Sequence, residues 1–249
     1  MRKPCIVILG GVGPMAGVAL HQRLVALAKF AETDQQHPDI VHLSYASRIP
    51  DRTEYVAGRE TSNPGICAAE IMRPYIELLR AEQRAYRLVI PCATFHAPSI
   101  LDPFFEHLGH TARQHFVDMT VCAAATALQQ ADSGRIGILA TTGSVLAGVW
   151  TVPIEQRGGS VCTLTDALQE GVHNAIYDQQ YGVKANAAGS PEAIAALQAA
   201  LDYFRDQEVN TVIMGCTEIP LIADALRRDG LSLIDPLIEL ANSALFSAP

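Results

Sequence analysis

Short apolar runs bounded by glycine or proline alternate with longer segments of helical period in the first half of the chain. Residues 5–11, 40–45 and 87–91 are apolar enough to predict buried strands, and residues 15–32 and 67–84 have the spacing of helices. Strands that alternate with helices favour a parallel sheet joined by crossover helices. The first half therefore predicts one α/β lobe.

The second half repeats this pattern. Residues 135–143 resemble residues 5–11, as an apolar run that ends in small residues and glycine, and residues 209–215 resemble residues 87–91. Cys92 and Cys216 follow the first strand of their halves at nearly the same interval. We therefore predict two pseudo-symmetric α/β lobes, each a mostly parallel sheet flanked by helices. Residues 1–116 with 232–249 form the first lobe, and residues 117–231 form the second.

The repeat also predicts where the site lies. Open α/β sheets bind ligands outside the carboxyl ends of their strands, so we expect the active site in a cleft between the lobes, with a thiol on either wall. Each half carries one long polar connection, at residues 47–65 and 178–191. Loops longer than about 12–15 residues in compact domains are usually functional or disordered, and we interpret these two as lids over the cleft.

Composition and charge indicate which classes of binding partner the chain is suited to. The chain has 249 residues, a net charge of −8 and no run of Lys or Arg, which argues against nucleic acid or an anionic membrane as a partner. The N-terminal MRKPCIVILGG lacks the cleavage site of a signal peptide, and no apolar stretch approaches the ~18–20 residues that span a bilayer. We therefore expect a cytoplasmic protein that acts on a small molecule.

The six cysteines show no metal-ligand spacing, and neither do the histidines, so we predict no metal site. A disulfide framework is improbable in a cytosolic chain of this size. The two segments that carry chemistry are PCATFHAP at 91–98 and GCTEIPLI at 215–222. In both, a cysteine follows an apolar strand at a predicted helix start, where the helix dipole biases a thiol toward thiolate.

Two such thiols match a specific reaction. Inverting a carbon next to a carboxylate without a cofactor requires one group to remove the proton from one face and another to supply it to the opposite face. Cys92 and Cys216 on opposing walls would satisfy this geometry, and the free backbone N–H groups with the Thr94 and Thr217 hydroxyls could hold a carboxylate. The alternative is that each cysteine is a buried core residue after a strand.

An ordered set of motifs resembles those of the aspartate/glutamate racemase family, in the Asp/Glu/hydantoin racemase superfamily. In chain order they are GGVGP (10–14), DQQH (34–37), IPDRT (49–53), SNPG (62–65), PCATFH (91–96) and GCTEIPL (215–221). The family counterparts are GGMGP, D-Q-x-H, PDRT, N-P, C-N-T-A-H and G-C-T-E-[LI]-P-L. The resemblance covers nearly the full chain and implies a two-lobed, PLP-independent amino-acid racemase without cofactor, and a homodimer.

The resemblance also implies roles for single residues. Cys92 and Cys216 would be base and acid, each for one stereochemical direction, and Arg52 and Lys184 would hold the distal carboxylate of an acidic amino acid. Further residues match pocket positions: Thr53, Thr94, Thr217 and Glu218. The residue types alone leave open that Arg52 and Lys184 are exposed loop cations. Glu218 would either relay a proton to Cys216 or cap a helix.

Three substitutions depart from the family pattern around the predicted pocket. Ala93 stands where the family has an Asn that hydrogen-bonds the substrate, while Val12 replaces Met and Phe95 replaces Ala. We therefore expect a substrate bulkier or less polar than aspartate at that end. His96 lies four residues after Cys92, on the same face if a helix begins there. It would tune the thiol, touch the ligand or pack behind the site.

Other functions remain open. Gly11, Gly13 and Ala16 spell the dinucleotide fingerprint G-x-G-x-x-A, but the acidic residue expected at the end of the second strand is missing, since that strand ends in Ser44 and Tyr45. A related isomerase or decarboxylase acting on another carboxylate is the nearer alternative, because Ala93 removes the polar anchor. A ligand-binding or redox-sensing protein could use the same cleft.

Overall fold

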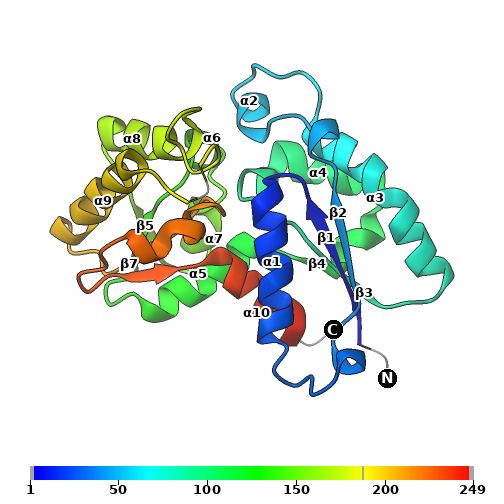
Figure 1. The fold of residues 1–249 in the computed structure, drawn as a ribbon. Coiled ribbons are helices and arrows are strands. Elements are labelled where there is room, and N and C mark those ends of the chain that lie inside the picture. The colour runs from blue at the N-terminus through cyan, green and yellow to red at the C-terminus, as the bar shows by residue number, and fades with distance from the viewer. Residues whose placement is uncertain (1–2, 187, 247–249) are drawn as a thin grey trace. The chain divides into compact units, whose positions relative to one another are not determined.

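The computed structural model describes residues 3–186 and 188–246, which divide into two compact units. The first comprises residues 3–119 and 237–246, and the second comprises residues 120–186 and 188–236. Figure 1 shows strands wrapped by helices in each unit. None of the described helices is both long and apolar enough to cross a membrane.

The first unit is built on a parallel sheet with strand order β2-β1-β3-β4. Its strands are β1 (Cys5–Gly10), β2 (Ile40–Ser44), β3 (Tyr86–Val89) and β4 (Phe116–Val117). Every residue of β1 and β3 is buried, as expected for the central strands of a sheet covered on both faces. The unit's helices are α1 (Pro14–Leu27), α2 (Arg52–Val56), α3 (Pro64–Ala81), α4 (Pro98–Leu108) and α10 (Pro236–Phe246).

Local chemistry moves two helix boundaries away from the predicted ones. Helix α3 begins at Pro64 because the Asn63 side chain accepts hydrogen bonds from the backbone N–H groups of Gly65 and Ile66, and proline is favoured in the first turn. A Cβ at Gly65 would lie 2.0 Å from the Ile100 carbonyl oxygen, so glycine is required where α3 passes α4. Helix α1 ends at Leu27, because the chain turns at Ala28 and Lys3 packs over the Phe30 ring.

The last helix returns to the first sheet through a buried arginine. Arg87 on β3 donates hydrogen bonds to the carbonyl oxygens of Ser243 and Ala244 near the end of α10. Burial lowers the pKa of this guanidinium below its ordinary value. The carbonyls at the end of a helix carry partial negative charge, so the contact both caps α10 and fixes it to the sheet.

The second unit has the same strand arrangement, β6-β5-β7-β8, again parallel. The strands are β5 (Arg135–Ile138), β6 (Ser160–Cys162), β7 (Thr211–Ile213) and β8 (Ser232–Ile234). The helices are α5 (Met119–Gln130), α6 (Thr142–Leu146), α7 (Thr151–Glu155), α8 (Asp166–Tyr177) and α9 (Pro191–Asp206). Strand β5 is shorter than the predicted 135–143 because Thr141 already caps α6, accepting a hydrogen bond from Ser144 N–H.

Strand pairing shows to which sheet the segments at the unit boundaries belong. Residues 232–234 were expected in the first lobe, but they form β8, which pairs with β7 in the second sheet. Val117, expected at the start of the second lobe, pairs with Val89 in the first. Both segments join the sheet in which their backbone N–H and C=O groups find partners, a requirement that overrides small differences in local composition.

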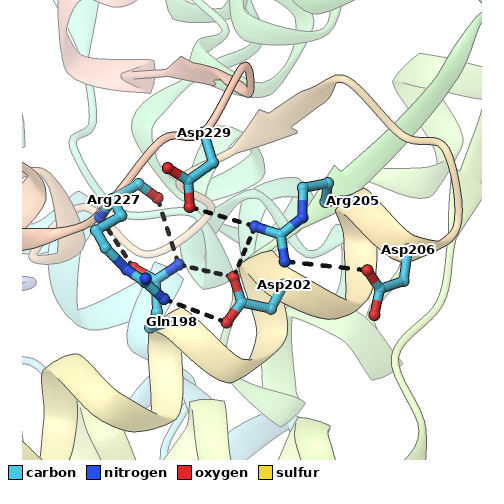
Figure 2. Close-up of polar contacts among 6 residues, drawn as sticks. All are labelled: Gln198, Asp202, Arg205, Asp206, Arg227 and Asp229. Carbon is cyan, nitrogen blue, oxygen red and sulfur yellow. Dashed lines mark hydrogen bonds and ion pairs between the residues drawn. The ribbon is translucent and has the colours of Figure 1, made fainter.

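A surface network holds the segment that leads into β8. Figure 2 shows Arg205 on α9 between Asp202, Asp206 and Asp229, and Gln198 bonded to the backbone of Arg227. The Arg205 guanidinium lies 3.0 Å from an Asp202 oxygen and 3.3 Å from an Asp229 oxygen. Single exposed ion pairs contribute little, but several charges around one guanidinium restrict the loop.

Candidate active site

Both predicted cysteines occupy the same position in their own sheets. Cys92 is the third residue after β3, and Cys216 is the third residue after β7. Each of these strands pairs with the first strand of its unit, β1 or β5. The side chains are buried, 8% and 7% exposed, and neither forms a disulfide. Each thiol is therefore placed at the carboxyl edge of a parallel sheet, where α/β folds bind ligands.

The Cys92 segment forms a 3₁₀ turn over Thr94–His96 instead of the predicted α-helix start. Its backbone bonds run from His96 N–H to Ala93 C=O at 2.9 Å and from Ala97 N–H to Thr94 C=O at 3.1 Å. Ala97 precedes Pro98, and a residue before proline is disfavoured in the α region. The chain accordingly extends at Ala97 before α4 begins, which limits the turn to a few residues.

Two predicted pocket residues of the first unit lie on a helix beside this turn. Helix α2, which carries Arg52 and Thr53, packs against the 3₁₀ turn and is capped by Asp51, whose carboxylate accepts from Thr53 N–H at 2.7 Å. Arg52 is 8% exposed, so it is not the solvated loop cation that its position in a polar connection allowed. Its Nη1 donates to the Pro50 carbonyl. Val12 is buried just after β1.

In the second unit, Glu218 contacts three other predicted site residues. The Cys216 Sγ lies 3.0 Å from Glu218 Oε2, and the Lys184 ammonium lies 3.3 Å from Glu218 Oε1. The Thr217 hydroxyl is 3.4 Å from Glu218 Oε2. Because an ionised carboxylate can only accept, the thiol and the ammonium are the donors. Glu218 makes no side-chain cap to the following 3₁₀ helix, Ile219–Ala225, which favours the relay role over the capping role.

The surroundings of Cys216 keep it protonated. Burial raises the pKa of the Cys216 thiol well above its ordinary value of 9.0, the negative charge of Glu218 raises it further, and Lys184 offsets part of the rise. The prediction that this thiol is biased toward thiolate is therefore wrong. A segment that starts a short 3₁₀ helix gives little dipole stabilisation, and the nearby carboxylate outweighs it.

Comparisons with known proteins show the family of the chain. The family model described as Asp/Glu/Hydantoin racemase matches residues 9–244. The chain belongs to this family. A glutamate racemase from Limosilactobacillus fermentum is 29% identical over 124 residues, which cover 49% of this chain and 43% of that enzyme. The chain thus matches less than half the length of that relative.

Solved structures of the racemase family share the fold. The Picrophilus torridus aspartate racemase superposes with a TM-score of 0.72 at 22% identity, covering 98% of this chain and 93% of that one. The Francisella tularensis glutamate racemase, solved with D-glutamate, has a TM-score of 0.64 at 18% identity, covering 100% of this chain and 85% of that one. The predicted α/β fold with two similar parallel sheets is therefore confirmed.

Further contacts hold the segments that carry the predicted site residues. Asn63 donates to Tyr55 on α2 at 2.8 Å and to the Ser99 carbonyl at 2.9 Å, so the weak SNPG motif fixes the connection beneath α2. Tyr177 lies under the Lys184 ammonium, 5.0 Å from the ring centroid. The lid interpretation of residues 47–65 and 178–191 stays a prediction, and Ala187 lies outside the described residues. The first of these connections contains α2.

We looked for side chains that could bind a metal ion in residues 3–186 and 188–246 and found no such set. No three His, Cys, Asp or Glu side chains gather there as ligands of one ion. His96 and Asp118 approach each other in the first unit, and Cys216 and Glu218 in the second, but each is a pair.

Proposed function

We propose that the chain is a cofactor-independent racemase or epimerase that inverts the Cα of a small acidic amino acid. Cys92 and Cys216 act as the paired base and acid. The observation that carries the proposal is the Cys216 thiol, which donates to a carboxylate at the same topological position where the other sheet presents Cys92. Membership of the racemase family supports it.

The proposed reaction is two proton transfers at one carbon. A Cys92 thiolate takes the Cα proton, and the electron pair of the broken C–H bond delocalises into the adjacent carboxylate. The Cys216 thiol then gives its proton to the opposite face of Cα, which leaves Cys92 as thiol and Cys216 as thiolate. Glu218 and Lys184 are placed to return a proton to Cys216, because Glu218 touches both the thiol and the ammonium.

The cations and hydroxyls supply substrate binding in this proposal. Arg52 and Lys184 pair with the distal carboxylate, as the family resemblance implies. The hydroxyls of Thr53, Thr94 and Thr217 bind the carboxylate at Cα, and Val12 and Ala93 shape the apolar wall. Since Lys184 already pairs with Glu218, a substrate carboxylate competes for that ammonium. Substrate binding therefore weakens the Lys184–Glu218 pair and favours proton transfer through Glu218.

The test is proton exchange at Cα. Purified protein is incubated in D₂O with a panel of amino and hydroxy acids, and ¹H NMR follows the loss of the Cα signal while circular dichroism follows inversion. We expect exchange and inversion for an acidic amino acid without added cofactor. Cys92→Ala and Cys216→Ala should each abolish inversion, and Cys92→Ser should retain at most a trace, because a hydroxyl is hardly ionised at neutral pH.

Cys162→Ala is the matched control, because Cys162 is buried to the same degree, 7% exposed, and lies on β6 of the second unit, where its sulfur accepts a hydrogen bond from Arg135. It should keep wild-type turnover. Wild-type turnover in either Cys92→Ala or Cys216→Ala would refute the two-base assignment. We also expect a homodimer, in line with the family resemblance, which sedimentation of the full chain measures.

A second function deserves the same assay, because Ala93 brings no polar group next to Cys92 and is buried. A related isomerase or decarboxylase would use one cysteine on a different carboxylate. Such an enzyme would convert its substrate into a new compound, visible in the same NMR spectra, while the panel of amino acids would show no loss of the Cα signal.

A further inference from the structure

His96 has a set of contacts that a simple core residue does not need. Its Nδ1 lies 2.8 Å from the Cys92 carbonyl oxygen, and its Nε2 lies 3.7 Å from Asp118 Oδ1. The ring packs at 5.5 Å from the Phe116 ring, and the residue is 7% exposed. One buried ring therefore connects the Cys92 backbone with a carboxylate just beyond β4.

The carbonyl contact fixes the position of one proton. A carbonyl oxygen only accepts, so Nδ1 carries hydrogen and donates it. The 3.7 Å separation at Nε2 is too long for a hydrogen bond but is within ion-pair range when the ring is doubly protonated. Nε2 is buried and has no hydrogen-bond partner among the described residues. The nearby Asp118 carboxylate is the group that would satisfy a proton there.

The bond to Cys92 supplements a weak piece of backbone. The 3₁₀ turn uses the carbonyls of Ala93 and Thr94 for its own hydrogen bonds, and 3₁₀ geometry is poorer than that of an α-helix. The His96 side chain adds a bond from the end of the turn back to Cys92. It thereby fixes the peptide group of the residue whose sulfur must meet the substrate.

We propose that His96 is a positioning residue that clamps the Cys92 carbonyl, with Asp118 holding the far side of its ring. The inference rests on the proposed role of Cys92 and deepens it. A packing role alone would be served by the ring against Phe116 and would not depend on a donor at Nδ1. The proposal requires that donor.

Three substitutions at His96 distinguish the contribution of the Nδ1–H donor from that of the aromatic ring. His96→Phe keeps an aromatic ring against Phe116 and removes both nitrogens. His96→Asn removes the ring but keeps an N–H donor at the position of Nδ1. His96→Gln places its donor farther out, toward Asp118. If His96 positions Cys92, the asparagine variant is the one that recovers function.

The first measurement needs no substrate. In ¹H–¹⁵N spectra of the full chain, the His96 Nδ1 should be protonated in wild type. The backbone amide signals of residues 92–95 should move in His96→Phe and return toward wild type in His96→Asn. Signals that are unaffected by the phenylalanine variant, or an Nδ1 without hydrogen, would overturn the clamp. This outcome is independent of whether the chain racemises anything.

The second measurement is the Cα exchange rate with the substrate found in the NMR screen. Losing a buried hydrogen bond next to the base should lower kcat about tenfold in His96→Phe with KM little changed, and His96→Asn should recover most of the loss. Equal loss in both variants would mean that the ring matters and not the donor, and would overturn the proposal. Should the phenylalanine variant not fold, His96→Gln replaces it, with the same expectation of no recovery.

Discussion

The two cysteine segments occupy equivalent positions in sheets of the same topology, yet their neighbours differ in kind. Cys216 donates to the Glu218 carboxylate, which Lys184 also contacts. No carboxylate contacts the Cys92 sulfur among the described residues, and a histidine holds its backbone carbonyl instead. Cys92 lies between Pro91 and Ala93. Cys216 lies between Gly215 and Thr217.

This difference indicates that the two thiols have different roles although the fold around them is repeated. The strand arrangement fixes where each thiol lies, and the residues immediately around it decide which protonation state is favoured. The resting chain should present Cys216 as the proton donor, because its pKa is raised. In the proposed reaction, Cys92 is then the group that removes the Cα proton. The comparison can be tested by altering the neighbours one at a time.

Gly215→Ala should have the largest effect on stability. A Cβ at this position would lie 2.8 Å from Trp150 Nε1 and 3.0 Å from the Ala140 Cβ, and Trp150 is 2% exposed. Overpacking of this kind costs about 1–3 kcal/mol of unfolding free energy and would also displace Cys216. Urea unfolding measures the first effect, and the Cα exchange rate measures the second.

Gly171→Ala is the control for this substitution. Gly171 lies in α8 of the same unit, where an added Cβ would come no closer than 3.9 Å to its nearest neighbour, the Ala196 Cβ. Replacing glycine within a helix should stabilise the chain by up to about 1 kcal/mol. If Gly215→Ala is as stable as Gly171→Ala, then the Trp150 ring does not support the Cys216 segment and this part of the comparison fails.

Glu218→Gln should make the two thiols more alike. The amide keeps the shape of the carboxylate but removes its negative charge, so the pKa of Cys216 falls toward its ordinary value. More thiolate at neutral pH should speed the alkylation of Cys216 by iodoacetamide about tenfold or more. Peptide mapping by mass spectrometry measures both cysteines in one sample, and Cys92 serves as the internal control. An unchanged Cys216 rate would show that burial alone keeps the thiol protonated.

The sequence was sufficient for the fold because strand and helix patterns depend on local hydrophobicity. The alternation of apolar runs with helical segments predicted both sheets, and the matched spacing predicted a cysteine after each central strand. What it missed depends on long-range partners. Residues 232–234 were placed in the wrong lobe because a strand's partner is not encoded in its own composition. The protonation of Cys216 was misjudged for a similar reason, since the burial that raises its pKa most is produced by the fold, and the Glu218 carboxylate raises the pKa further.

The surroundings of Cys216 also predict that the free energy of unfolding depends on pH. Because the pKa of Cys216 is raised in the folded chain, the unfolded chain binds fewer protons above the ordinary value of 9.0. Stability from this thiol is therefore complete below about pH 9 and is lost as pH rises further, by about 1 kcal/mol over one pH unit. Unfolding free energies at pH 8, 9 and 10 should fall more steeply in wild type than in Cys216→Ala.

The control for this dependence is internal to the chain. Burial also raises the pKa of Cys5, but Cys5 is present in both proteins, so its contribution cancels in the difference. Equal slopes in wild type and Cys216→Ala would mean that Cys216 ionises as easily in the folded chain as in the unfolded one.

Ala93→Asn should have the smallest effect and bears on substrate choice. Ala93 and Thr217 follow the two cysteines, and only the second brings a side chain that hydrogen-bonds. Asn restores the residue that the racemase family carries after its first cysteine, so it should shift exchange toward aspartate or glutamate by a few-fold, about the value of one hydrogen bond. Ala93→Leu adds similar bulk without an amide, and it should reduce exchange without that shift. If the Asn variant keeps the wild-type substrate profile across the NMR panel, Ala93 does not set the specificity, and the difference between the two cysteine segments lies in proton transfer alone.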